Sequence, residues 1–354
     1  MTEKFRNIAS ASDWWVHPTG PTNLITDIPG VTVGHFTHNS GETARTGVTA
    51  ILPHSGNLFE QPVHAGAAVL NGFGKSAGLV QVAELGEIES PIILTNTFAV
   101  ADCTKAIIKR TIAQNPEVGR KLPTINPLVL ECNDGVVNDI QAFHVSEAMV
   151  DKAIDAANSQ FDQGTVGAGT GMKTFGYAGG VGSASRMVRL PGKNGKGSKH
   201  SYHLGALVLS NFGQKSELRI MGQKPISFNP AQAEPADKGS IIIVLATDAP
   251  LDSRQLTRIC KRSSAALGRL GSYLGNQSGD IAVAFSTQNV KSRSGEVVYD
   301  AQLLSESCMN AFFHCTVEAV EEAVLNAMWH GRATPAYSGK ILPEFAAFFT
   351  QKTA

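Results

Sequence analysis

Residues 239–250 read GSIIIVLATDAP, and the Pro-rich stretch 225–239 leads into them. The run 241–246 is continuously apolar and of strand length, which is typical of a strand buried on both faces. Ser240 is therefore predicted to be the first residue of a buried strand, directly behind a glycine. An ordinary loop-to-strand junction is one interpretation of these residues, because such junctions are common.

A second interpretation is that the peptide bond between Gly239 and Ser240 is cut. Cleavage would leave Ser240 with a hydroxyl nucleophile and a free α-amino group on the same residue. The amine can then serve as the base that activates the hydroxyl, as in self-processed N-terminal nucleophile hydrolases. Both interpretations stay open on these residues alone.

The composition is that of an ordinary globular α/β protein. The chain has 354 residues, of which 42% are hydrophobic, enough for one large domain or two smaller ones. Thirty basic residues balance thirty acidic ones, so no overall field attracts nucleic acid or an anionic membrane. Five scattered cysteines without a CxxC pattern favour buried thiols in a reducing compartment. No membrane-length apolar run or signal-like start is present, and we expect a cytoplasmic protein.

Strand and helix patterns are interleaved along the chain. Strands are predicted within 23–35, 46–53, 91–95, 128–131, 204–209 and 241–247, and helices at about 98–113, 145–159, 252–269 and 305–330. The third helix starts with a capping box, Asp252 to Gln255. No break in composition divides the chain, which predicts a single domain over residues 1–354.

Several other patterns admit a functional or a purely structural interpretation. Residues 74–78 read GKSAG and match the nucleophile elbow around Ser76, although such patterns arise easily in a glycine-rich chain. His35 and His38 are three residues apart, but the strand pattern does not place them on one face, so hydrogen-bonding roles are expected. The remaining histidines are isolated, and no metal is predicted. For the glycine runs 167–171 and 179–182, tight packing of the backbone near a site or plain turn geometry is expected, and not a phosphate-binding loop.

Polar groups at strand ends supply further candidates. Glu131 ends an apolar strand, where a substrate contact and the start of a turn are equally good interpretations. The turn interpretation is favoured for Asp134. Ser278 and Asp280 enter the strand 281–287, and they either orient a nucleophile or form a plain glycine turn.

Taken in order, these segments resemble a known family. The matching stretches are 25–35, 46–49, 89–97, 131–135, 166–172, 204–213, 239–250 and 278–280. They resemble the L-aminopeptidase/D-esterase and β-peptidyl aminopeptidase family (DmpA-like), which belongs to the DmpA/ornithine acetyltransferase superfamily. The resemblance runs from about residue 22 to residue 332.

The resemblance implies an α/β fold, a layered αββα sandwich. It implies self-cleavage into an α chain, residues 1–239, and a β chain, residues 240–354. The activity implied is that of an N-terminal serine aminopeptidase, amidase or esterase. It would act on small peptides and on amino-acid amides or esters, without a cofactor, as a homo-oligomer and specifically a tetramer.

The resemblance also implies roles for single residues. Ser240 matches the nucleophile, and Ser278 and Asp280 match the positions that assist it. Asn211 matches the amide that stabilises the oxyanion, and Glu131 the carboxylate that receives the free amine of the substrate.

Two departures from the family pattern accompany these matches. Val136 stands where some members carry a tyrosine, and it has no side-chain hydrogen bond to give. Lys75 reverses the charge of the glutamate that some members carry at its position. Two alternative functions follow, an acyltransferase of the same superfamily and a catalytically weak binding descendant. The superfamily acetyltransferases use a threonine nucleophile, so Ser240 argues against acyl transfer.

Overall fold

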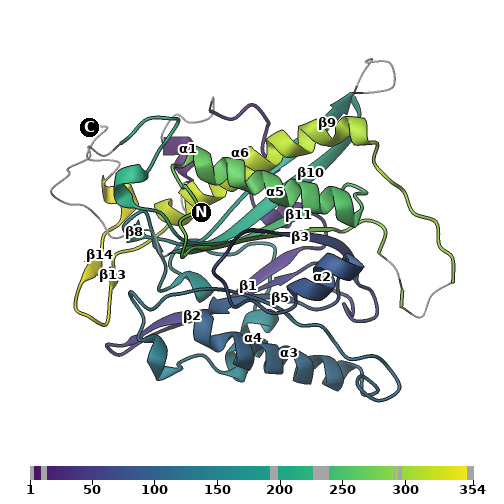
Figure 1. Ribbon diagram of the computed structural model, residues 1–354, viewed down its shortest axis with the longest axis horizontal. Coiled ribbons are helices and arrows are strands. Elements are labelled where there is room, and N and C mark those ends of the chain that lie inside the picture. Colours follow the sequence, from purple (N-terminus) through teal and green to yellow (C-terminus); the bar gives the residue numbers. More distant parts are fainter. Residues whose placement is uncertain are drawn as a thin grey trace.

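A computed structural model describes residues 4–8, 14–191, 198–225, 239–290, 292–293 and 297–348. Two central β-sheets lie against each other, and helices cover the outer face of each sheet (Figure 1). Helices α5 and α6 form the upper layer of this view, and α3 and α4 form the lower layer. The predicted αββα sandwich is confirmed.

The six-stranded sheet contains, at its centre, the strand that begins at Ser240. Its order is β4(Glu87–Ile88), β3(Val63–Gly72), β12(Gly279–Ser286), β11(Ser240–Thr247), β10(Ser198–Asn211) and β9(Gly180–Pro191). Strand β11 runs parallel to β12 and antiparallel to β10. The first residues of β11 and β12 therefore lie beside the last residue of β10.

The four-stranded sheet is built from the first half of the chain. Its order is β1(Thr32–Ser40), β2(Ala44–Leu52), β5(Ile92–Asn96) and β6(Leu128–Cys132). Strands β1 and β2 form the antiparallel pair expected from the sequence, whereas β5 and β6 are parallel. Strand β6 carries Glu131 next to its last residue.

The four long helices occur close to their predicted ranges. They are α3(Val100–Gln114), α4(Glu147–Asp155), α5(Ser253–Arg269) and α6(Met309–Trp329). The capping box of α5 is present, because Asp252 accepts from the Gln255 backbone N–H at 2.6 Å and Gln255 Oε1 accepts from the Asp252 N–H at 3.2 Å. None of the helices in the described ranges is long and apolar enough to cross a membrane.

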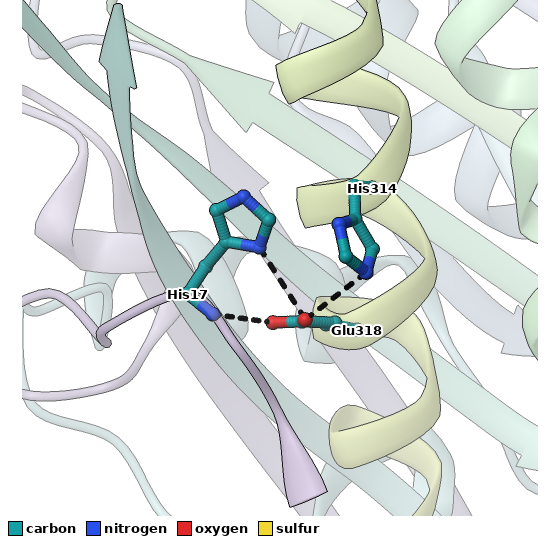
Figure 2. Close-up of side chains that lie close together, drawn as sticks. All are labelled: His17, His314 and Glu318. Carbon is teal, nitrogen blue, oxygen red and sulfur yellow. Dashed lines mark hydrogen bonds and ion pairs between the residues drawn. The ribbon is translucent and has the colours of Figure 1, made fainter.

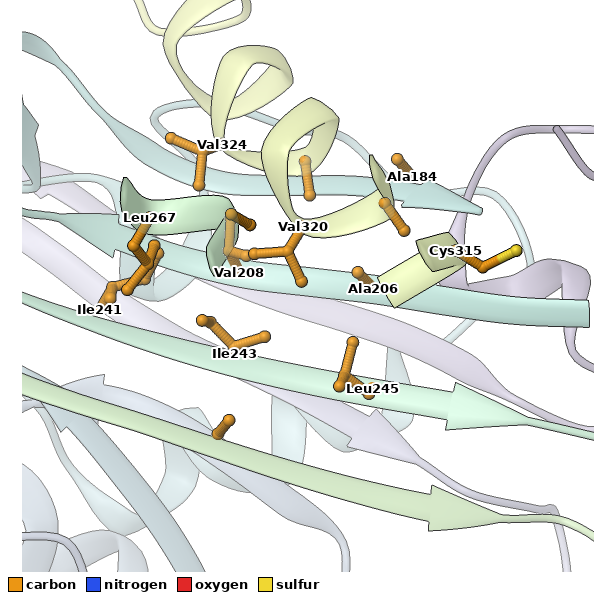
Figure 3. Packing of buried hydrophobic residues seen from close by; sticks show 14 of the residues in the cluster. Ala184, Ala206, Val208, Ile241, Ile243, Leu245, Leu267, Cys315, Val320 and Val324 are labelled. Carbon is orange, nitrogen blue, oxygen red and sulfur yellow. The ribbon is translucent and has the colours of Figure 1, made fainter. Parts of the chain in front are cut away.

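Strand β11 is buried on both faces, which explains its unbroken apolar run. All eight of its residues are buried. Ile241, Ile243 and Leu245 pack toward α5 and α6 (Figure 3), and Ile242 and Val244 join the core between the two sheets. A third cluster lies between the four-stranded sheet and the helices α3 and α4.

The remaining elements are short. They are α1(Phe5–Ile8), α2(Leu79–Leu85), β7(Lys173–Thr174), β8(Tyr177–Ala178), β13(Thr334–Pro335), β14(Ile341–Leu342) and several single 3-10 turns. The run 179–182 enters β9 at Gly180, so the turn interpretation is wrong there, whereas the interpretation of tight backbone packing is confirmed, because a Cβ on Gly180 would lie 2.0 Å from the Gly164 carbonyl oxygen. All five cysteines are free thiols, four of them buried.

Candidate active site

Ser240 is the first residue of β11 and lies at an end shared by three strands. It is paired with Asn211 of β10 on one side and with Gly279 of β12 on the other. Because side chains alternate along a strand, Ser240 shares the face of Ile242 and Val244 and points between the sheets. Its Oγ is buried, and no partner with hydrogen-bond geometry lies within the described residues.

The backbone on either side of the Gly239–Ser240 bond is tightly held. The Gly279 N–H donates to the Gly239 carbonyl oxygen at 3.3 Å. A Cβ on Gly239 would lie 2.2 Å from the Asn211 carbonyl oxygen and 2.5 Å from Phe212 Cα, so β10 packs directly on this glycine. Residues 226–238 of the predicted processing loop lie outside the described residues.

Ser278 and Asp280 enter the neighbouring strand together. Ser278 Oγ donates to Asp280 Oδ1 at 2.6 Å, and both side chains are buried. The hydroxyl keeps its lone pairs available, since its proton is engaged by the carboxylate. The two residues thus form the hydroxyl–carboxylate pair anticipated from the sequence, one strand away from Ser240.

Asn211 is held in one orientation by two backbone groups. Its Oδ1 accepts from the Lys173 N–H at 2.9 Å, and its Nδ2 donates to the Asn133 carbonyl at 2.9 Å. These opposite requirements fix which end of the amide is the donor. One N–H of the Asn211 amide is therefore engaged, and the second can serve another acceptor.

Glu131 is a buried carboxylate that accepts hydrogen bonds from two neutral donors. Its Oε1 accepts from the Lys75 backbone N–H at 2.8 Å, and its Oε2 accepts a short hydrogen bond from the Thr97 hydroxyl. The side chain is 4% exposed. Neutral donors orient the carboxylate without cancelling its charge, so an ammonium group would be a favourable partner.

The pKa of Cys132, the residue after Glu131, is affected by the charges around Ser240. Burial raises the pKa of its thiol well above the ordinary value, and the negative charges of Glu131 and Asp280 add to that increase. The neighbouring Ser240 hydroxyl opposes it. Ser240, the candidate nucleophile, therefore lies near two carboxylates, those of Glu131 and Asp280, which come from different sheets.

The two departures from the family pattern have clear positions. The Lys75 ammonium lies over the Phe73 ring, 3.9 Å from its centroid, so its charge is turned toward an aromatic face. Its backbone, not its side chain, holds Glu131. Val136 follows β6 in an exposed turn, with 55% of its surface accessible.

Within the described residues, the fold brings no catalytic partner to Ser76 or to His35. Ser76 Oγ is buried without a hydrogen-bond partner among the described residues, so no histidine activates it there. His35 hydrogen-bonds Thr49 and the Asp162 carbonyl, and burial lowers its pKa to about 4, as a core role requires. A cavity beside α3 and the loop 54–59 is lined by none of the residues around Ser240.

Sequence reasoning missed several residues that hold the site. Thr97 lies within the matched stretch 89–97, but nothing in its spacing links it to Glu131. An Asx turn begins at Asn133, whose Oδ1 accepts from the Gly135 N–H at 2.9 Å. The turn expected at Asp134 is present, because its carbonyl accepts from the Val137 N–H at 2.9 Å. The Asp134 carboxylate is fully buried and accepts from Asn138 Nδ2 at 3.2 Å.

Comparison with known proteins gives the class of this site. The model of peptidase family S58 matches residues 23–342. A β-peptidyl aminopeptidase of Sphingosinicella microcystinivorans, BapA, is 37% identical over 337 residues, which cover 87% of this chain and 82% of that protein.

Two solved structures share the whole fold. A protein of Pyrococcus horikoshii OT3 superimposes with a TM-score of 0.87 and 41% identity, covering 97% of both chains. The L-aminopeptidase D-Ala-esterase/amidase of Ochrobactrum anthropi, described as a serine aminopeptidase and a variant of the Ntn hydrolase fold, gives a TM-score of 0.84. It is 34% identical and covers 96% of both chains.

The chain therefore belongs to peptidase family S58. It is a serine aminopeptidase of this family, with the same variant of the N-terminal nucleophile hydrolase fold.

Proposed function

We propose that the chain cuts itself between Gly239 and Ser240, and that the new N-terminal serine then hydrolyses peptides, amides or esters through an acyl-enzyme. The observation that carries this proposal is the position of Ser240. It begins a central buried strand, its hydroxyl has no described hydrogen-bond partner, and the preceding carbonyl accepts from the Gly279 N–H.

Self-cleavage would begin with attack of Ser240 Oγ on the Gly239 carbonyl carbon. The C–N bond to Ser240 breaks as the ester to Oγ forms, and the nitrogen takes up a proton to become the α-amine. Water then hydrolyses the ester and leaves a Gly239 carboxylate. The Gly279 N–H, 3.3 Å from the carbonyl oxygen, would stabilise the negative charge that develops there.

In the mature enzyme the Ser240 amine would act as the base. An α-amino group has a pKa of about 8, so about a tenth of it is unprotonated at pH 7 and can act as a base. Ser278 and Asp280 begin the adjacent strand, where their hydroxyl and carboxylate would hold the protonated amine. This support matters because a serine hydroxyl is a weak nucleophile until a base takes its proton.

Asn211 would stabilise the oxyanion of the substrate reaction. Its amide is fixed by Lys173 and Asn133, so the donor end requires no reorganisation when charge develops. Removal of one such donor typically lowers kcat by about 10²–10³-fold.

Glu131 would select substrates that carry a free N-terminal amine. Its charge is buried and is bonded by a hydroxyl and a backbone N–H, which leaves it able to pair with an ammonium group. An acylated substrate would bury this carboxylate without its partner, at a cost of about 1–3 kcal/mol or more. The substrate class follows: small peptides, amides and esters with a free amino terminus.

Assembly and location stay predictions. We propose a homo-oligomer, specifically a tetramer of processed units, which light scattering would measure. The cytoplasm is proposed as the compartment on the strength of the five free thiols.

Denaturing electrophoresis with N-terminal sequencing tests the processing step. Two fragments are expected, the smaller beginning with the sequence SIII at Ser240. Ser240→Ala should give a single full-length band and no hydrolysis of an aminoacyl p-nitroanilide. Ser76→Ala is the matched control, since Ser76 is also a buried serine without a described partner. A full-length wild-type protein with full activity would refute the proposal.

The role of Glu131 is tested with a pair of substrates. The wild type should hydrolyse an aminoacyl p-nitroanilide and fail to hydrolyse its N-acetyl derivative. Glu131→Gln keeps the size of the side chain and should reduce this discrimination while self-cleavage continues. Equal turnover of the free and acetylated substrates by the wild type would remove Glu131 from the mechanism.

A further inference from the structure

The segment that leads into the first strand is fastened to α6 by a carboxylate. The backbone N–H of Val16 donates to Glu318 Oε1 at 2.8 Å, and that of His17 donates to Glu318 Oε2 at 3.1 Å. Trp15 Nε1 donates to Glu321, one turn further along the same helix, at 2.9 Å. Two imidazoles accompany this attachment, one from the segment and one from the helix (Figure 2).

Three potential ligand atoms converge beside α6. His17 Nδ1 lies 3.3 Å and His314 Nε2 lies 3.4 Å from the same oxygen, Glu318 Oε1. All three atoms lie within 4.8 Å of one another. His17 Nδ1 is buried, and no described residue meets it with hydrogen-bond geometry. His17 Nδ1 thus lies close to the carboxylate without a hydrogen bond to it.

These separations fit the first coordination shell of zinc. Zinc binds histidine nitrogen and carboxylate oxygen at about 2.0–2.2 Å, so neighbouring ligand atoms of a tetrahedral site are about 3.3–3.5 Å apart. The two nitrogen–oxygen distances fall at that spacing. His314 and Glu318 are four residues apart on one helix, which places them on the same face. Rotation of the exposed His314 side chain can bring its nitrogen closer to His17.

The surrounding groups hold the carboxylate in place. Arg186 is completely buried, and its Nε donates to Glu318 Oε2 at 3.0 Å. Oε2 thus accepts from Arg186 and from the His17 N–H, whereas Oε1, the oxygen nearer to both imidazoles, accepts from the Val16 N–H. Partners of this kind orient first-shell ligands in metal sites.

The charges of the glutamates around this site are balanced by arginines within the protein. The ion pairs join three buried glutamates to three arginines: Glu318 to Arg186, Glu322 to Arg186 and Arg6, and Glu321 to Arg269. Their formal charges cancel when the imidazoles are neutral. A metal ion would thus be bound by the folded protein, and two neutral imidazoles and one carboxylate would supply its ligands.

We propose that His17, His314 and Glu318 form a binding site for a divalent transition metal, zinc in particular, with water completing its coordination. His314 is 51% exposed, so the ion can enter from solvent. Spacing along the sequence leaves these histidines isolated, and only the fold brings them together. If the chain is cut at Gly239, His17 belongs to the α chain and the other two ligands to the β chain. The ion would then link the two chains, a consequence that rests on the proposed processing.

Calorimetric titration of the chelator-treated, full-length protein with zinc chloride tests the site. The wild type should bind one zinc ion per polypeptide, and His314→Ala should weaken binding by at least about ten-fold. His17→Ala should have the same effect. The matched control is the double variant His38→Ala/His144→Ala, because these two rings also lie together, 5.6 Å apart, without a carboxylate between them.

Cobalt(II) supplies an independent spectroscopic readout. A site of two imidazoles and one carboxylate should give the visible absorption of tetrahedral cobalt in the wild type, and His314→Gln should abolish it. The Ser240→Ala protein should bind metal like the wild type, which separates this proposal from self-cleavage. No zinc binding by the wild type, or equal binding by His314→Ala, would overturn the site, and so would a comparable loss in the His38/His144 control.

Discussion

Gly239→Ala is the sharpest perturbation of the Ser240 site, because it adds one carbon at a contact between two backbones. The added Cβ would lie 2.2 Å from the Asn211 carbonyl oxygen and 2.5 Å from Phe212 Cα. Both are backbone atoms of β10 and its continuation, so no flexible side chain can move aside. Gly239 does not have a positive φ, and the effect of alanine therefore arises from space alone.

The size of the displacement determines how much self-cleavage is expected to slow. Non-bonded carbon atoms settle at about 3.5–4.0 Å, so Gly239 must move away from β10 by roughly 1 Å. A misplacement of about 1 Å at reacting groups can cost about 10²-fold in rate. The movement would also disturb the bond from the Gly279 N–H to the Gly239 carbonyl. We expect self-cleavage to slow by about 10²-fold.

The assay follows the full-length band on denaturing gels after cell-free synthesis. Gly268→Ala in α5 is the matched control, because a Cβ there meets nothing within 4 Å and its φ is not positive. It should be processed at the wild-type rate and be slightly more stable, by about 0.5–1 kcal/mol. Near-ultraviolet circular dichroism should show Gly239→Ala to be as well folded as Ser240→Ala. Processing of Gly239→Ala at the wild-type rate would refute the argument that β10 fixes the scissile bond.

Three further substitutions probe the site and its support. Thr97→Val removes the hydroxyl that orients Glu131 and should raise KM for an aminoacyl p-nitroanilide about ten-fold while gels show unchanged self-cleavage. Asn211→Ala should lower kcat by about 10²–10³-fold, measured by steady-state kinetics on processed protein. Burial raises the pKa of Asp134 to about 6, above its ordinary value of 3.8. The folded state thus favours the protonated form, and this contribution to stability is present below pH 4 and is lost as the pH rises through 6. The loss is about 3 kcal/mol of the free energy of unfolding. Urea unfolding should therefore show that this free energy decreases less between pH 4 and pH 6 in Asp134→Asn than in the wild type.

The sequence predicted those elements whose patterns are local. Apolar periodicity located α3 to α6, and the alternation of strands and turns located β1 and β2. At 179–182 the turn interpretation is wrong and the interpretation of tight backbone packing is right, because this run enters β9. A Cβ on Gly182 would lie 2.0 Å from the Ala323 carbonyl oxygen of α6, so glycine is needed there for the helix to approach β9.

Contacts between distant segments had no local signal. His17 and His314 meet only because the segment before the first strand lies along α6. Thr97 reaches Glu131 because β5 and β6 are parallel neighbours that end together. The role of Glu131 stays a prediction, which its place at a strand end leaves open and the family pattern supports.

The register of β11 explains why glycines flank Ser240. Both faces of this strand are apolar, so a slip of one residue would exchange one buried face for the other, and hydrophobic pattern alone sets the register weakly. Close contacts between backbones fix the register of β11 more firmly. Gly239 fits against β10, and Gly279 lies where a Cβ would be 2.5 Å from the Phe73 carbonyl oxygen. Only glycine fits at each of these two contacts, so each contact fixes one residue of its strand at one position in the sheet. The glycines that bring the strand ends together therefore also determine that Ser240, and not Ile241, points between the sheets toward Cys132.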